Sequence, residues 1–171
     1  MIEILTTASP LYLVILINTA AWFVFHMLGA GLASRLPIRL FHYHTWLYKT
    51  RGWEQKGVLY QKLFRIRSWK KYLPDGAAMF RGGFPKKHIL PGQQREYYQV
   101  FIKETCRAEL THWIVFLAAP LFFLWNDWLI AIWMIPYAAA SNAPCILAQR
   151  YNRPRIELYS SLLRNGGKKE L

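Results

Sequence analysis

Apolar and polar positions divide the chain into long apolar runs separated by a basic stretch. The first apolar run covers residues 11–33 and contains no Lys, Arg, Asp or Glu. It is longer than the roughly 20 apolar residues that cross a bilayer as a helix, so we predict a transmembrane helix over 11–33. A cleaved signal peptide is the alternative. However, no basic residue precedes this run, and the run is longer than the apolar part of a signal peptide.

The second apolar run, residues 113–147, is interrupted by the sequence WNDW at residues 125–128. Asn126 and Asp127 favour a turn, because their short side chains bond to nearby backbone groups. The interruption therefore predicts a helical hairpin with arms over 110–125 and 128–147. Because the first arm is short for a full span, we expect it to begin below the membrane surface, to tilt, or to enter and leave on one side.

Residues 34–109 mix apolar and basic positions. Leu59, Leu63 and Ile66 recur at roughly helical spacing among Lys and Arg residues. This pattern predicts an amphipathic helix along the membrane interface over Lys56–Gly76, with Trp69 at headgroup depth. Five Gly and Pro residues within 80–94 exclude a regular element there and indicate a loop.

Helical periodicity returns from Gln94, and no segment alternates apolar and polar residues over a meaningful strand length. We therefore predict an all-α fold, with one small polytopic membrane domain over 1–171. Its parts are the helix over 11–33, the basic cytoplasmic and interfacial segment over 34–109, the hairpin and a tail over 148–171.

The charge distribution predicts the orientation of these parts. Lys and Arg total 22 against 9 Asp and Glu, a net charge of +13. All 22 lie between Arg35 and Arg107 or between Arg150 and Lys169. Because Lys and Arg gather on the cytoplasmic side, we expect the N-terminus outside a bacterial cell membrane, and the basic segment and tail in the cytoplasm. Anionic lipids account for the charge, so we predict no nucleic-acid partner.

Several kinds of site are not indicated. Cys106 and Cys145 are not in a CxxC pair, and His42 and His44 would point to different faces of a helix. We therefore predict neither a disulfide nor a metal site. The sequence also lacks glycine-rich phosphate loops and the GxSxG and HExxH motifs.

Two carboxylates and one histidine are candidates for acid–base chemistry. Glu109 and His112 are three residues apart and share a helical face. A carboxylate orients an imidazole and raises its basicity, which suits a general base that takes a proton from an alcohol. A pair that only satisfies itself at a helix end is an equally open interpretation. Asp75 either forms a turn or supplies a second carboxylate.

A polar, basic segment follows the last apolar run. Guanidinium groups match phosphate geometry, so its arginines suit an anion-binding site. Pro154 favours an extended conformation for Arg153, which would splay the guanidinium groups off the helix axis. A simple membrane anchor is the alternative, but an anchor needs only charge. The additional polar residues favour binding: Gln149 and Asn152 lie among Arg150, Arg153 and Arg155.

Four segments, in this order and spacing, resemble the glycosyl-4,4'-diaponeurosporenoate acyltransferase family. They are ASRLP (33–37), RSWKKYLPDG (67–76), RAELTHW (107–113) and NAPCILAQRYNRPR (142–155). The resemblance implies a membrane acyltransferase that esterifies the sugar of a glycosylated C30 carotenoid acid, the last step toward staphyloxanthin. The implied partners are membrane lipids, this carotenoid acceptor, an acyl-CoA or acyl carrier protein thioester as co-substrate, and other pigment-pathway enzymes. No cofactor is implied.

The matching motifs also suggest roles for residues. His112, oriented by Glu109, is the candidate base, and Asp75 is the further catalytic candidate. The expected contacts to donor phosphate, substrate or the developing oxyanion come from Arg107, Gln149, Arg150, Asn152, Arg153, Arg155, Trp69 and Lys70.

Two other functions stay open at this stage. One is an acyltransferase or another transferase, such as a methyltransferase, that acts on a different glycolipid or isoprenoid lipid, and the mass of the product would distinguish it. The other is a non-catalytic membrane adaptor for pigment enzymes. The adaptor predicts that replacing His112 leaves acylation intact.

Overall fold

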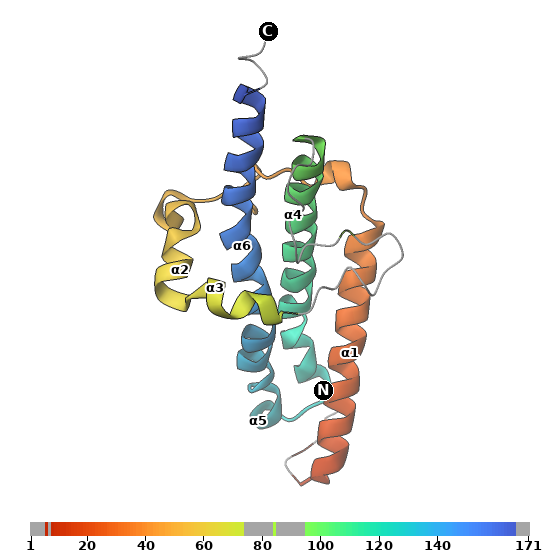
Figure 1. Ribbon diagram of the computed structural model, residues 1–171. Helices are drawn as coiled ribbons and strands as arrows, with labels where there is room; N and C mark the ends of the chain where they lie inside the picture. The colour runs from red at the N-terminus through yellow and green to blue at the C-terminus, as the bar shows by residue number, and fades with distance from the viewer. Residues whose placement is uncertain (1–5, 7, 74–83, 85–94, 167–171) are drawn as a thin grey trace. The chain divides into compact units, whose positions relative to one another are not determined.

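The computed structural model describes residues 6, 8–73, 84 and 95–166. These residues form helices and turns without a β-strand, which confirms the predicted all-α fold. The elements are α1 (Leu11–Arg35), η1 (Ile38–Leu40), η2 (Gly52–Gly57), α2 (Val58–Phe64), α3 (Ile66–Trp69), η3 (Lys70–Tyr72), α4 (Arg95–Leu117), η5 (Ala119–Leu124), α5 (Trp128–Ala131) and α6 (Met134–Gly166) (Figure 1).

Within the described residues, three helical segments are long and apolar enough to cross a membrane: Leu11–Arg35, Arg95–Leu124 and Trp128–Leu163. One is N-terminal and two are C-terminal, as predicted. By its contacts the chain forms two compact units. The first contains Met1–Leu36 and Leu110–Pro144, and the second contains Pro37–Glu109 and Cys145–Leu171.

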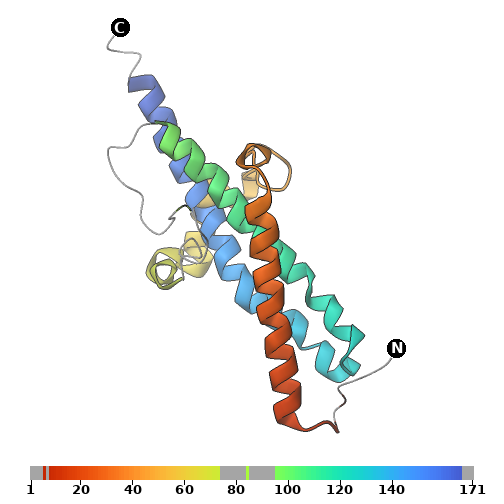
Figure 2. The same ribbon diagram turned by 90° about the vertical axis from the view of Figure 1, so that its right-hand side faces the viewer.

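In the first unit, α1 packs through one face against the C-terminal part of α4 (Figure 2). Its buried residues, Asn18, Trp22, Gly29 and Ala33, are four or seven positions apart and therefore share that face. A Cβ atom at Gly29 would lie 2.9 Å from Cγ2 of Val115. Glycine at this position lets the two backbones approach closely, as small residues do between membrane helices.

The hairpin turn forms where the sequence predicts it. The Asp127 side chain accepts a hydrogen bond from the backbone N–H of Leu129 (3.2 Å) and caps α5. The buried amides of Asn18 and Asn126 bond to each other reciprocally, at 3.0 and 2.9 Å. Because Trp125 Nε1 also donates to Asn18 (3.1 Å), the turn is tied to α1 by polar side chains.

Two helices extend well beyond the predicted hairpin arms. Helix α4 begins at Arg95, next to the point where helical periodicity returns in the sequence, and it runs without a break into the first arm. Helix α6 continues past residue 147 to Gly166. In the second unit they lie side by side, with Tyr98, Phe101 and Ile102 packed against Ile156. The predicted end of the second arm followed hydropathy, whereas buried contacts such as those of Ile156 stabilise the polar turns of α6 beyond it.

The expected extended conformation of Arg153 is wrong, because α6 runs through Pro154. A proline inside a helix removes one backbone N–H donor, here the one that would bond to the carbonyl of Arg150. Arg150 and Arg153 are anchored by buried side-chain hydrogen bonds on this part of the helix. Those contacts offset the lost bond, as packed neighbours do for prolines in membrane helices.

The predicted amphipathic helix over 56–76 is broken into shorter pieces. Arg65 adopts a left-handed conformation (φ 47°) that separates α2 from α3, and η3 follows to Tyr72. The break brings Ile66, which is fully buried, against Tyr60 and Tyr151. Packing of Ile66 therefore overrides a continuous helix. Asp75 and the predicted loop over 80–94, apart from Phe84, lie outside the described residues.

Candidate active site

His112 lies on α4 within the first unit and pairs with Asn142 of α6. The distance from His112 Nδ1 to Asn142 Oδ1 is 2.9 Å. Asn142 is fully buried, and its Nδ2 donates to the carbonyl oxygen of Ala138 (3.0 Å) and to the hydroxyl of Ser141 (3.1 Å). The imidazole is thus fixed by an amide from a helix turn about 30 residues further along the chain.

These partners determine which imidazole nitrogen carries the hydrogen. The carbonyl of Ala138 can only accept, so the Asn142 amide must direct Nδ2 toward it and Oδ1 toward His112. An Oδ1 atom can only accept, so Nδ1 of His112 carries the hydrogen. Neutral His112 then has its lone pair on Nε2, the nitrogen that can take a proton from a substrate.

Glu109, the predicted partner of His112, belongs to a different set of interactions in the second unit. Its Oε2 accepts a hydrogen bond from Arg153 Nη2 (2.6 Å), and its Oε1 accepts one from Arg150 Nε (2.8 Å). Glu109 is fully buried, and Arg153 is only 1% exposed. Both oxygens of this carboxylate therefore neutralise arginines, and the orienting role for His112 falls to Asn142.

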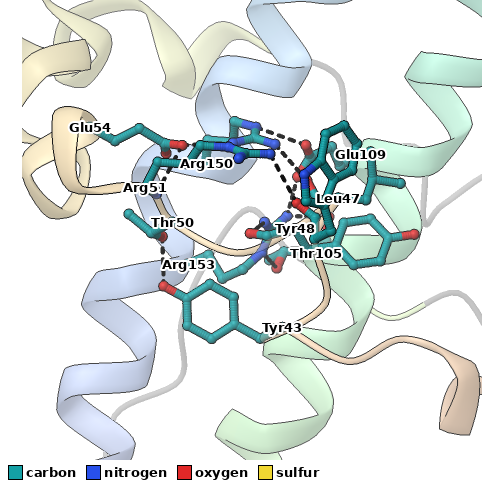
Figure 3. A network of polar contacts seen from close by, with 11 residues as sticks. Tyr43, Leu47, Tyr48, Thr50, Arg51, Glu54, Thr105, Glu109, Arg150 and Arg153 are labelled. Carbon is teal, nitrogen blue, oxygen red and sulfur yellow. Dashed lines mark hydrogen bonds and ion pairs between the residues drawn. The ribbon is translucent and has the colours of Figure 1, made fainter.

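The other guanidinium nitrogens of Arg150 and Arg153 also donate hydrogen bonds to protein groups (Figure 3). Arg150 Nη1 donates to buried Glu54 (2.8 Å), and its Nη2 donates to the carbonyl of Leu47 (2.6 Å). Arg153 donates to the hydroxyl and carbonyl of Thr105 and to the carbonyl of Tyr48, at 2.9–3.2 Å. We call the two arginines and the two glutamates the buried ionic network.

Two positive charges balance two negative charges in the buried ionic network, and every guanidinium nitrogen has a protein acceptor. An ion pair removed from water is stable only when its hydrogen bonds are satisfied in this way. Arg150 and Arg153 were expected to bind a substrate anion. Because every nitrogen of these guanidinium groups already donates to a protein group, a structural role is favoured for both, joining the 47–54 segment to α4 and α6.

A second basic cluster in the same unit surrounds Tyr151, which is 1% exposed. Arg67 Nε donates to the Tyr151 hydroxyl (2.7 Å), and the Arg155 guanidinium stacks 3.7 Å from the ring centroid. Lys70 Nζ lies 5.1 Å from the same centroid and donates to Asn152 Oδ1 (2.7 Å). We call Arg67, Lys70 and Arg155 the Tyr151 cation cluster.

The Tyr151 cation cluster has no acidic partner in the described part of the chain: no Asp or Glu there forms an ion pair with any of its members. Burial lowers the pKa of Lys70 below its usual value, and repulsion from Arg155 and Arg67 lowers it further. Fixed donors and uncompensated positive charge are the properties of an anion site.

The other predicted site residues have varied surroundings. Trp69 Nε1 donates to the carbonyl of Phe64 (2.6 Å), which closes the break between α2 and α3. Arg107 pairs with Glu104 one turn away (2.6 Å) and is half-buried, and Gln149 is also half-buried. Asp75 lies outside the described residues. The structure therefore brings Lys70, Asn152 and Arg155 together around Tyr151, in a set of contacts different from that of Glu109.

Four contributors were missed from the sequence. Asn142 lies inside an apolar run, where a polar amide is itself a signal of a specific contact. Arg67 and Tyr151 lie in two of the segments that carry the family resemblance, but their pairing could not be predicted because the partners are distant in sequence. Glu54 gave no signal for the same reason.

Comparison with known proteins gives one family. Residues 44–161 match the family described as glycosyl-4,4'-diaponeurosporenoate acyltransferase. The chain is 35% identical to the glycosyl-4,4'-diaponeurosporenoate acyltransferase of Staphylococcus haemolyticus (strain JCSC1435), over 86% of this chain and 85% of the relative. It is 32% identical to the protein of the same name from Staphylococcus aureus (strain bovine RF122 / ET3-1), over 86% and 88% respectively. No solved structure matches the chain.

Proposed function

Because this chain belongs to the glycosyl-4,4'-diaponeurosporenoate acyltransferase family, we propose that it esterifies the sugar of a glycosylated C30 carotenoid acid with a fatty acyl chain. Acyl transfer follows from the family. The proposal adds the acceptor, a thioester donor and the residues that act on them. The product would be a staphyloxanthin-type pigment.

The reaction exchanges a thioester for an oxygen ester. The oxygen of a sugar hydroxyl attacks the carbonyl carbon of the acyl thioester while a base takes the hydroxyl proton. The carbon–sulfur bond then breaks, and the thiolate leaves with that proton. The products are the acylated sugar and a free thiol, so no oxidant, reductant or metal is needed.

His112 is our candidate for the base, and its bond to Asn142 is the observation that carries this assignment. That bond keeps the hydrogen on Nδ1 and the lone pair on Nε2, so neutral His112 is ready to accept the hydroxyl proton. After attack, the imidazolium returns the proton to the leaving sulfur. Asn142 is therefore a positioning residue. Asp75 stays a candidate for a second acid–base group.

The membrane arrangement follows from chemistry and charge. A carotenoid glycoside keeps its polyene in the bilayer and its sugar at the surface, while a thioester donor arrives from the cytoplasm. We propose that the three apolar helical segments span the cell membrane. The basic 37–72 segment and the C-terminal end then face the cytoplasm, in accordance with the distribution of Lys and Arg.

The experiment that tests this function is mass spectrometry of lipids from a host that makes the glycosylated carotenoid acid. The host would express this chain, its His112→Ala variant or neither. The expected result is a new fatty acyl ester of the glycoside with the wild-type chain and its loss with His112→Ala at equal protein level.

Each other outcome has a distinct meaning. An acyl ester that persists with His112→Ala would exclude His112 as the base and favour an adaptor. A methyl adduct would identify another transferase. No new species, with the protein present in the membrane, would contradict the carotenoid acceptor.

A further inference from the structure

Arginines of α6 belong to two groups of basic residues, and only one of these groups is neutralised by carboxylates. Arg150 and Arg153 have both glutamates of the buried ionic network. Arg155, with Arg67 and Lys70, has no carboxylate among the described residues. Gathering like charges around one buried tyrosine opposes folding, because the repulsion is stronger where water is excluded. A bound anion would remove that repulsion.

We propose that the Tyr151 cation cluster is a phosphate-binding site. Arg67 uses only Nε in its bond to Tyr151, and Arg155 uses Nη1 in its bond to the Tyr151 carbonyl (2.8 Å). Each guanidinium therefore keeps an edge of N–H donors, the geometry that bonds to two phosphate oxygens at once. Lys70 adds an ammonium group next to them.

The cluster is held in place by the fold, which distinguishes it from scattered surface charges. The ring of Tyr151 supports Arg155 on its face, and its hydroxyl fixes Arg67. Gly57 lets the start of α2 approach α6, since a Cβ there would lie 3.1 Å from the Tyr151 carbonyl oxygen. Ile66 buries α3 against Tyr151, which brings Lys70 to Asn152.

The phosphate that this site takes belongs, in our proposal, to the acyl donor, an assignment that rests on the proposed function. Both kinds of thioester donor carry phosphate: coenzyme A has a diphosphate and a 3'-phosphate, and a carrier protein has the phosphodiester of its phosphopantetheine. A phospholipid headgroup offers the same chemistry from the bilayer. The test therefore includes both sources.

The experiment uses the full chain in nanodiscs of phosphatidylcholine, with calorimetric titration of coenzyme A and, separately, of inorganic pyrophosphate. We expect both to bind. Arg67→Gln, Lys70→Gln and Arg155→Gln should each weaken coenzyme A binding about tenfold or more, because each removes a charge-assisted hydrogen bond. Lys71→Gln is the matched control, since Lys71 is adjacent but lies over the exposed Tyr72 ring and should leave binding unchanged.

A conservative variant and a second measurement test whether a loss of binding is caused by misfolding. Lys70→Arg keeps the charge and should keep binding within about threefold, whereas Lys70→Gln should not. Pyrophosphate should raise the melting temperature of the wild type and of Lys71→Gln, with a smaller rise in each Gln variant of the cluster. Equal losses in Lys71→Gln and the cluster variants, or no binding of either probe to folded wild type, would overturn the site.

A binding experiment with an anionic lipid distinguishes the phosphate of the acyl donor from that of a phospholipid headgroup. The same variants are compared in nanodiscs with phosphatidylglycerol, using a fluorescent phosphatidylglycerol as probe. If the cluster variants lose this lipid while coenzyme A does not bind the wild type, the donor assignment is overturned. If coenzyme A binds through the cluster but no thioester yields an acylated glycoside, the proposed function fails and the phosphate site stands.

Discussion

Nδ1 of His112 and Oδ1 of Asn142 are 2.9 Å apart, and the hydrogen bond that Nδ2 of the same amide donates to the carbonyl of Ala138 leaves only one orientation for it. The consequence is a defined tautomer. A histidine that acts as a base through Nε2 depends on this bond, whereas a histidine that only fills space does not.

Replacing Asn142 by Ala should therefore lower kcat with a small change in KM. The imidazole would lose both its preferred tautomer and its orientation, while His112→Ala would remove the proposed base itself. Since a positioned base contributes about 10²–10⁴-fold, we expect a loss in that range for His112→Ala and a smaller loss for Asn142→Ala. The measurement is the initial rate of acyl ester formation in membranes at matched protein level.

Ser141→Ala provides the graded control for this prediction. Ser141 accepts one of the two hydrogen bonds from the Asn142 amide, and the bond to Ala138 would remain. Its rate should stay within a few-fold of wild type, on the order of one neutral hydrogen bond. A Ser141→Ala rate as low as that of Asn142→Ala would point to a packing defect instead of a tautomer effect.

We expect the loss of Glu109 to lower the stability of the protein more than the activity of the folded molecule. Replacing it by Gln leaves two buried arginines with one carboxylate, Glu54, between them. Breaking a buried pair costs about 3–5 kcal/mol, because a charge stays buried without compensation. We expect a large drop in melting temperature and protein level, with residual activity per folded molecule.

The control for Glu109 is an exposed pair in the same unit. Glu157 lies 3.4 Å from His44, and their side chains are 37% and 80% exposed. Such pairs contribute about 0–1 kcal/mol, so Glu157→Gln should barely change the melting temperature. Normal stability of Glu109→Gln together with lost activity would restore the direct catalytic role expected from the sequence.

The apolar helices were predictable, because transmembrane length and the absence of charge are local properties of the sequence. The first helix ends within two residues of its expected boundary. The hairpin turn was also predictable, because the preference of Asn126 and Asp127 for turns is a local property of these residues.

The site was only partly predictable, because burial decides which polar groups meet. Spacing placed Glu109 and His112 on one helical face, but each bonds to a different residue of α6. Proximity in sequence does not show which of several nearby polar groups will form a hydrogen bond with a carboxylate. Similarly, Arg153 and Arg155 look alike in sequence, yet one is fully neutralised and the other is not.

Gly57→Ala should destabilise the second unit and disturb the Tyr151 cation cluster. Gly57 has φ +85°, where a residue with a Cβ is strained, and the added atom would meet the Tyr151 carbonyl oxygen at 3.1 Å and the Arg155 guanidinium at 3.2 Å. Unfavourable backbone conformations of this kind cost on the order of 1–3 kcal/mol. Thermal unfolding should show this loss, and coenzyme A titration should show weaker binding.

Gly52→Ala is the matched control for Gly57→Ala. A Cβ atom at Gly52 would meet nothing within 4 Å, and its φ is not positive. We expect unchanged coenzyme A binding and a change in unfolding free energy within about 0.5 kcal/mol, as for an ordinary surface substitution. Similar losses in both variants would show that the 52–57 segment is sensitive to any side chain, without a specific role for the contact at Tyr151.

Anion binding at the Tyr151 cation cluster should depend on pH through Lys70. Burial and the neighbouring arginines lower its pKa in the folded protein below the ordinary 10.5. The charged form therefore opposes folding, and stability without ligand should rise as pH increases through the folded pKa. A bound phosphate favours the charged form and raises that pKa again, so binding takes up protons and affinity falls over the same range.

Titration of coenzyme A in buffers of different ionisation enthalpy measures this proton uptake. We expect uptake to begin at a pH below 10.5 in the wild type. Lys70→Arg stays charged throughout this range, so it should bind with little uptake and a flat pH dependence. Equal uptake in both proteins would assign the proton to another group, whereas loss of uptake only in Lys70→Arg would locate the bound phosphate beside Lys70.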